Sequence, residues 1–138
     1  MPHYLRYIVT DERDFSLAAL QDGLRAVDPA WTFANLTAGM PATAELHHSG
    51  ERLASLELDR REVEIFKEEI AELIEIAENE PGAHQGVVLI ALRKARALLA
   101  VEVHWGDREP EETRALLTPL FAWLFEHCKG LQHEDGVG

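Results

Sequence analysis

The sequence contains one cysteine, Cys128, among its 138 residues, so no intramolecular disulfide can form. A domain without disulfides is typical of a reducing compartment. The first six residues, MPHYLR, also lack the apolar segment of a signal peptide. We therefore expect a cytoplasmic protein.

Long hydrophobic runs are missing as well. Residues 87–103 are the most apolar stretch, but Arg93, Lys94 and Arg96 interrupt it. Because charged side chains are costly in hydrocarbon, we expect no membrane span. The hydrophobic content of 46% and the charged content of 28% are globular values. The length fits one domain, which we assign to residues 1–133, followed by a flexible C-terminal tail at 134–138.

Basic residues are scarce relative to acidic ones. The 13 Lys and Arg oppose 25 Asp and Glu, which gives a net charge of −12, and the basic residues form no basic-aromatic patch. Nucleic-acid binding is therefore disfavoured. Residues 57–80 contain ten acidic and three basic residues. The net charge of this segment is therefore ten minus three, or seven, negative charges out of the total of −12. Such a surface favours a basic partner.

Catalytic and cofactor motifs are absent from the sequence. We find no GxGxxG or GxxxxGK[ST] phosphate-binding loop, no HExxH or spaced Cys/His pattern, and no DxDxDG calcium loop. We therefore expect no cofactor and no metal ion, and no motif assigns a reaction.

Hydrophobic periodicity and breaker residues nevertheless predict an ordered series of strands and helices. Strands are expected at residues 4–10, 31–36, 43–48, 51–58 and 97–105, and a short edge strand from 131; helices are expected after a cap at Asp14, at 61–78, at 83–93 and from about 107 to 128. This order is neither a strict βαβ alternation nor an all-β string. It predicts an α+β fold, a two-layer sandwich in which a mixed, mainly antiparallel sheet of about five strands carries helices.

The acidic helix expected at residues 61–78 is amphipathic. Its apolar stripe comprises Phe66, Ile70, Leu73, Ile74 and Ala77, and its opposite side comprises Glu64, Glu68, Glu72 and Glu75. Like charges at i, i+4 repel, so this arrangement suggests a gain in solubility or in partner choice. Our first hypothesis is a non-enzymatic interaction domain, similar in charge and size to inhibitor or immunity proteins, that binds a basic partner through these four glutamates. A merely solvated helix face is the alternative.

One constellation of acid and base residues lies on the strand expected at 97–105. Arg96, Glu102 and His104 share a face of it, and Glu102 is close enough to His104 to orient the imidazole. No serine or threonine occurs in an elbow-type motif to serve as nucleophile. These residues are the weak catalytic candidates of an alternative hypothesis, a small ligand-binding protein or hydrolase with its site around Glu102 and His104. The structural alternative is a polar strand face.

Two other residue pairs contain side chains that can bind a metal ion or act as a thiol with its base. Neighbouring strand residues such as His47 and His48 point to opposite faces, so the pair cannot readily hold one metal ion. His127 precedes Cys128, but neighbouring helix residues do not face one another, and Cys128 falls on the apolar stripe. We expect a buried thiol.

Aromatic residues are concentrated on the last helix, with Phe121, Trp123 and Phe125 in alternate positions. Trp123 and Phe125 lie off the main apolar stripe. They are candidates for self-association in a homodimer, with core packing as the alternative.

Overall fold

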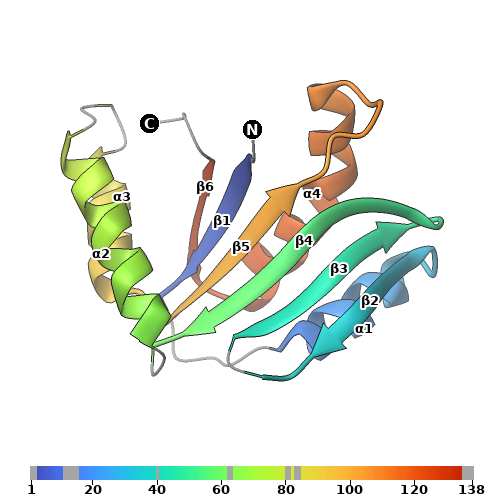
Figure 1. Cartoon of the computed structure of the whole chain (residues 1–138), viewed down its shortest axis with the longest axis horizontal. Helices are drawn as coiled ribbons and strands as arrows, with labels where there is room; N and C mark the ends of the chain where they lie inside the picture. The colour runs from blue at the N-terminus through green and yellow to red at the C-terminus, as the bar shows by residue number, and fades with distance from the viewer. Residues whose placement is uncertain are drawn as a thin grey trace.

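A six-stranded antiparallel sheet forms the centre of the structure, a computed structural model that describes residues 3–10, 16–39, 41–61, 64–79, 82 and 85–134 (Figure 1). Its elements are, in chain order, β1 (Tyr4–Val9), α1 (Leu17–Val27), β2 (Trp31–Thr37), β3 (Ala42–His48), β4 (Glu51–Arg60), α2 (Glu64–Asn79), α3 (Gln85–Lys94), β5 (Ala97–Val103), α4 (Pro110–His127) and β6 (Gly130–Glu134).

The strand order across the sheet is β2-β3-β4-β5-β1-β6, and each neighbouring pair is antiparallel. The predicted α+β sandwich is confirmed, with six strands rather than about five. β1 lies between β5 and β6, as expected for a strand that is apolar on both faces. The tail expected at residues 134–138 is only partly described, because β6 includes Glu134 and residues 135–138 lie outside the described residues.

The hairpin between β3 and β4 turns at Ser49 and Gly50. Both have positive φ, 52° and 80°, which is the backbone of a type I′ turn. The pairing shifts register between Leu46 and His47. This bulge lets both Leu53 and Ala54 face the same core, which explains the irregular hydrophobic phase of β4.

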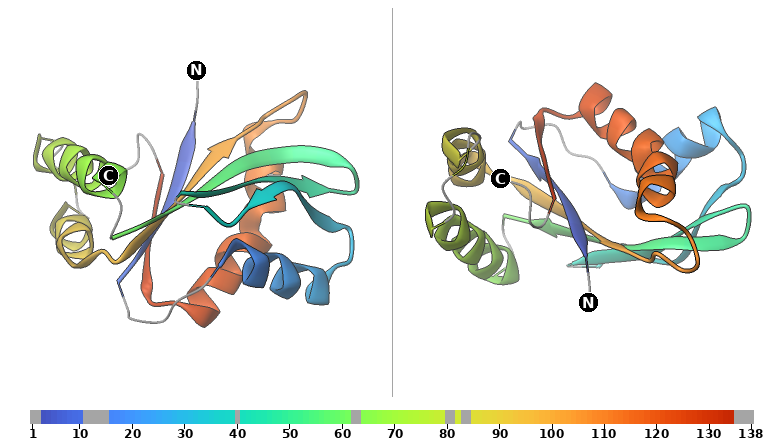
Figure 2. Two further views of the ribbon diagram at one scale, coloured as in Figure 1. Left: turned by 60° about the horizontal axis from the view of Figure 1, so that its bottom comes forward. Right: turned by 90° about the horizontal axis from the view of Figure 1, so that it is seen from above.

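One face of the sheet is covered by α1 and α4, which enclose the main hydrophobic core (Figure 2). Ser16 caps α1 by accepting a hydrogen bond from the backbone N–H of Ala19. The predicted cap, Asp14, lies outside the described residues. α4 is one continuous helix that includes Pro119, and the Thr118 hydroxyl donates to the Arg114 carbonyl one turn earlier.

The opposite face carries the pair α2 and α3 at one end only (Figure 2). A smaller cluster joins these helices to the sheet through Ile8, Phe66 and Leu98, which are buried together. The rest of this face, over β2 to β5, bears polar side chains. Among the described residues, no helix combines the length and apolarity that crossing a bilayer requires.

Candidate functional site: an acidic cavity beside α2

A cavity of about 460 Å³ lies on the polar face of the sheet beside α2. Strand alternation produces it. On β4, Leu56 and Leu58 face the main core, so Ser55, Glu57 and Asp59 face the other side. The polar side chains that line the cavity are Tyr4, Arg6, Asn35, Thr43, Glu45, Ser55, Glu57, Glu69 and Glu102. Four carboxylates thus face one guanidinium.

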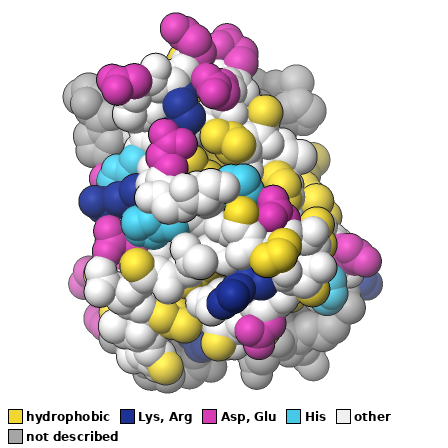
Figure 3. Space-filling view, turned by 90° about the vertical axis from the view of Figure 1, so that its right-hand side faces the viewer, with side chains coloured by type: hydrophobic (Ala, Val, Ile, Leu, Met, Phe, Trp, Pro, Cys, Tyr) yellow, Lys and Arg dark blue, Asp and Glu magenta, His cyan; other side chains and the backbone are white. Residues whose placement is uncertain are grey.

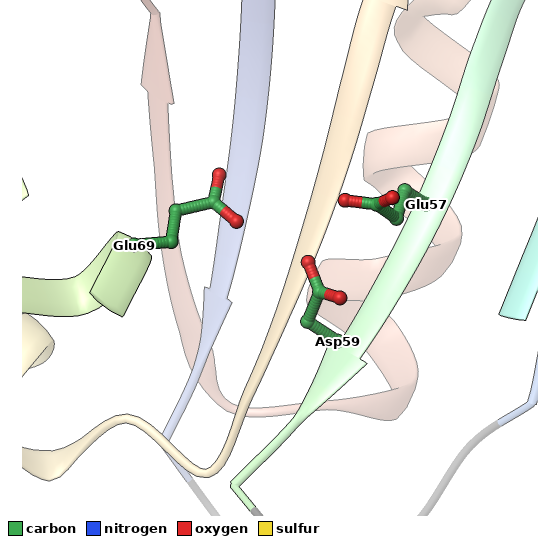
Figure 4. A group of neighbouring side chains, drawn as sticks. All are labelled: Glu57, Asp59 and Glu69. Carbon is green, nitrogen blue, oxygen red and sulfur yellow. The ribbon is translucent and has the colours of Figure 1, made fainter. Parts of the chain in front are cut away.

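Three carboxylates converge at the α2 end of this cavity: Glu57 and Asp59 from β4, and Glu69 from α2 (Figure 4). One oxygen of each lies within 4.8 Å of the others. Figure 4 shows the side chains pointing toward one another across the sheet surface. We call these three residues the carboxylate triad.

Asp59 is the most confined member of the triad. Its relative exposure is 0%, and neither of its carboxylate oxygens has a hydrogen-bonding partner among the described residues. A buried carboxylate normally accepts several hydrogen bonds or pairs with a cation. Among the described residues, Asp59 has neither hydrogen-bond donors nor a paired cation.

The triad is electrostatically strained. Burial and the charge of Asp59 raise the pKa of Glu57 to about 7. Burial also raises the pKa values of Asp59 and Glu69. Arg6 opposes this effect at Glu69, since its Nε lies 3.9 Å from Glu69 Oε1. Near neutral pH, one carboxyl group of the triad therefore binds a proton readily.

The sequence pattern indicates part of this triad but does not single out its three residues. Glu57 and Asp59 alternate with buried leucines, which places both on one strand face. The strand was predicted to end at residue 58, however, and the two acids were counted with the charge of the following helix. Glu69 was not foreseen because it lies at the border between the apolar stripe and the acidic side of α2.

The four glutamates proposed for partner binding are Glu64, Glu68, Glu72 and Glu75, and all are exposed on α2. Within the described residues, none of them forms an ion pair. The charge of Glu72 also raises the pKa of Glu69. The acidic side of α2 is therefore electrostatically continuous with the cavity.

Of the three catalytic candidates predicted on β5, Glu102 and His104 both lie near Ser55, whereas Arg96 lies apart from them. Glu102 lines the cavity and accepts a hydrogen bond from the Tyr4 hydroxyl at 3.4 Å. His104 lies just beyond β5 and contacts Ser55 instead, with 2.9 Å between Nε2 and Oγ. Burial and the charge of Arg52 lower the pKa of His104, which favours its neutral form. Arg96 is exposed at the opposite end of β5.

The two adjacent histidines of β3 have different surroundings. His48 Nε2 lies 2.9 Å from Asp28 Oδ2, and its ring packs against Trp31. Nε2 of His47 is buried without a hydrogen-bonding partner among the described residues. Figure 3 shows histidines interspersed with arginines and acids at this end of the molecule. Within the described chain, neither histidine belongs to a cluster that could hold a metal ion.

The remaining candidates predicted from the sequence lie on α4 or directly after it. Cys128 is a buried thiol, whereas His127 is exposed and stacks on Trp123. Trp123 is half-buried and packs closely against Gly23 of α1. Phe125 is 56% exposed, so it is the more accessible of the two proposed self-association residues.

Comparison with known proteins gives no relative: neither protein-family models, nor curated proteins, nor solved structures match this chain. Function is therefore inferred from the geometry and charge described above.

Proposed function

We propose that this protein is a non-enzymatic interaction domain that binds a basic polypeptide through the acidic side of α2 and the adjoining cavity. The observation that carries this proposal is that Glu64, Glu68, Glu72 and Glu75 are exposed and form no ion pair within the described residues. Their charge is thus available to an incoming cation.

The cavity supports the same proposal. Its volume of about 460 Å³ accommodates a lysine or arginine side chain, and its lining includes Glu45, Glu69 and Glu102. A basic residue of the partner would enter there while its neighbours meet the exposed glutamates. Desolvated charge pairs at the centre of an interface contribute more than pairs at its rim.

A pair of charge-matched variants tests the proposal. In the first, the four α2 glutamates are replaced by glutamine; in the second, the exposed Glu109, Glu111, Glu112 and Glu126 of the α4 region are replaced in the same way. Both lose four negative charges. Binding of a fluorescent oligolysine peptide is measured by anisotropy, from about 50 mM to about 500 mM salt, a range over which exposed charges become screened.

We expect the α2 variant to lose at least about tenfold in affinity, equivalent to about 1.4 kcal/mol, and the α4 variant to retain most of it. Affinity of the unmodified protein should fall with salt. Equal losses in both variants would mean that only net charge attracts the peptide, and the proposed surface would be wrong.

A second candidate function is favoured by the hydrogen bond between Ser55 and His104. The sequence offered no nucleophile in this region, but Ser55 lines the cavity with its Oγ 2.9 Å from the imidazole of His104, whose lowered pKa favours the neutral form. A hydroxyl beside a neutral histidine is the core of nucleophilic acyl transfer. We therefore keep as the alternative a hydrolase or small ligand-binding protein with its site around Glu102 and His104.

Covalent labelling separates this alternative from the first proposal. A fluorophosphonate probe should label Ser55 in the unmodified protein and in Ser49→Ala, a control in the nearby turn, but not in Ser55→Ala or His104→Ala. If the unmodified protein is not labelled at Ser55, the hydrolase is rejected.

A further inference from the structure

We propose that Glu57, Asp59 and Glu69 bind one hard divalent cation, at a site distinct from the exposed glutamates of α2. No metal ion was expected from the sequence, because these residues belong to no metal-binding motif. Glu57 and Asp59 share one face of β4, and Glu69 reaches toward them from α2, a segment that the tertiary fold brings beside that strand (Figure 4).

The separation of the three carboxylates suits a common ion. One oxygen of each lies within 4.8 Å of the others. Oxygen ligands of a calcium ion lie at about 2.3–2.6 Å from it, so two of them are at most about 5 Å apart. Glu57 and Glu69 also line the cavity, from which water molecules can complete the coordination shell.

Asp59 provides an independent reason to expect a cation. Its side chain is completely buried and is aimed into the triad, and neither oxygen has a hydrogen-bonding partner among the described residues. An ionised carboxylate in such surroundings is costly unless a cation compensates it. The Arg6 guanidinium lies near Glu69, with its Nε 3.9 Å from Glu69 Oε1.

The charge balance points to a divalent ion. Three carboxylates carry −3 when ionised, and the Arg6 guanidinium beside Glu69 supplies +1. The remaining −2 equals the charge that a divalent cation would neutralise. The ligand atoms are all carboxylate oxygens, without thiolate or imidazole, which selects calcium, magnesium or manganese over zinc or copper.

Calorimetric titration of the EDTA-treated and dialysed protein with calcium, magnesium and manganese chlorides tests the site. We expect saturable binding of one ion per chain. Asp59→Asn and Glu69→Gln should each weaken it at least about tenfold, a loss seen even when only a residue that supports a metal ligand is removed. Glu68→Gln is the matched control, since it removes the neighbouring exposed carboxylate and should leave binding unchanged.

Thermal unfolding distinguishes a lost site from a lost fold. The unfolding temperature of the unmodified protein should rise with calcium, because an ion that binds only the native state stabilises it. In EDTA, Asp59→Asn and Glu69→Gln should be at least as stable as the unmodified protein, and calcium should no longer raise their unfolding temperatures.

Two results would overturn the site: absence of saturable binding by all three ions up to about 1 mM, the weak end of natural calcium sites, or equal affinity in the Asp59 and Glu68 variants. In the first case the triad holds a shared proton instead. The oligolysine measurement is separate, because Asp59 is not exposed. Asp59→Asn should bind the peptide normally, so failure of either proposal leaves the other testable.

Discussion

Glu57 and Asp59 lie two positions apart on β4, on the same face of the sheet, and an oxygen of one carboxylate lies within 4.8 Å of an oxygen of the other. Asp59 is completely buried, so little water screens this repulsion. The fold therefore maintains a costly arrangement of charge where a neutral side chain would serve stability better. Such an arrangement is characteristic of a functional site.

Neutralising Glu57 should stabilise the protein when no divalent ion is present. The pKa of Glu57 is raised to about 7 in the folded state, above its ordinary value of 4.5. Its contribution to stability is thus fully present below about pH 4.5 and is lost as the pH rises through about 7. In EDTA at about pH 8, we expect Glu57→Gln to raise the free energy of unfolding by on the order of 1 kcal/mol.

Chemical denaturation at about pH 5 and about pH 8 measures this effect. The gain from Glu57→Gln should be larger at the higher pH, whereas Glu75→Gln, on the exposed side of α2, should change stability by no more than about 0.5 kcal/mol. A gain that is the same at both pH values would mean that Glu57 is not held in its raised-pKa environment.

Removing Arg6 should make the fold more dependent on a divalent ion. Its guanidinium lies near Glu69 and also over the Tyr4 ring, at 5.1 Å from the centroid. In EDTA, we expect Arg6→Met to lower stability by about 1–3 kcal/mol, since it leaves the triad uncompensated. Calcium should then raise the unfolding temperature by more than it does in the unmodified protein.

Arg52→Gln is the control for Arg6. Its Nε lies 3.2 Å from Glu45 Oε1 at the exposed rim of the cavity, and such pairs are worth about 0–1 kcal/mol. A calcium response in Arg6→Met no larger than in this control would contradict the charge balance proposed for the triad.

Replacing two helical glycines by alanine should change the stability of the protein in opposite directions. A Cβ at Gly23 would overlap Nε1 of Trp123, whereas a Cβ at Gly86 would meet nothing within 4 Å. We expect Gly23→Ala to destabilise by about 1–3 kcal/mol through overpacking. Gly86→Ala should stabilise by about 0.5–1 kcal/mol because alanine favours the helix. Urea denaturation of both variants measures this, and stabilisation by Gly23→Ala would show that α1 and α4 are not packed as described.

Self-association, which the aromatic residues of α4 suggest, should depend on Phe125 rather than Trp123. Phe125 is 56% exposed beside a second cavity of about 320 Å³, while Trp123 is engaged with α1. Light scattering after size-exclusion chromatography should detect a dimer whose population rises with concentration and falls in Phe125→Ser. Val27→Ser, on an exposed valine of α1, should behave as the unmodified protein. A monomer at every concentration would reject the homodimer.

Local pattern was sufficient to predict most of the fold. The stripe that includes Phe66 and Ile70 identified the buried side of α2, and the strands predicted at residues 43–48 and 51–58 leave between them the two residues of the β3–β4 turn. The strand count of about five was one too low, although a short edge strand from residue 131 was expected, because β6 has little apolar pattern of its own and is defined by its pairing with β1. Strand order was not predictable, since it depends on contacts between distant segments.

The site was harder to predict than the fold for the same reason. Ser55 and His104 are 49 residues apart, and only the pairing of β4 with β5 makes them neighbours. In the sequence, Asp59 is one of several acidic residues in a charged stretch. Only its burial in the structure distinguishes it from the exposed glutamates. Burial depends on how α2 lies beside the sheet, which is a tertiary property.

Amide chemical shifts recorded during titration with an oligolysine peptide show whether the acidic side of α2 binds basic polypeptides, as proposed. We expect saturable shifts concentrated in α2 and along the cavity rim at Glu45 and Glu102, with α4 unaffected. Shifts of equal size on α2 and on the acidic start of α4, or no saturation at low salt, would contradict it.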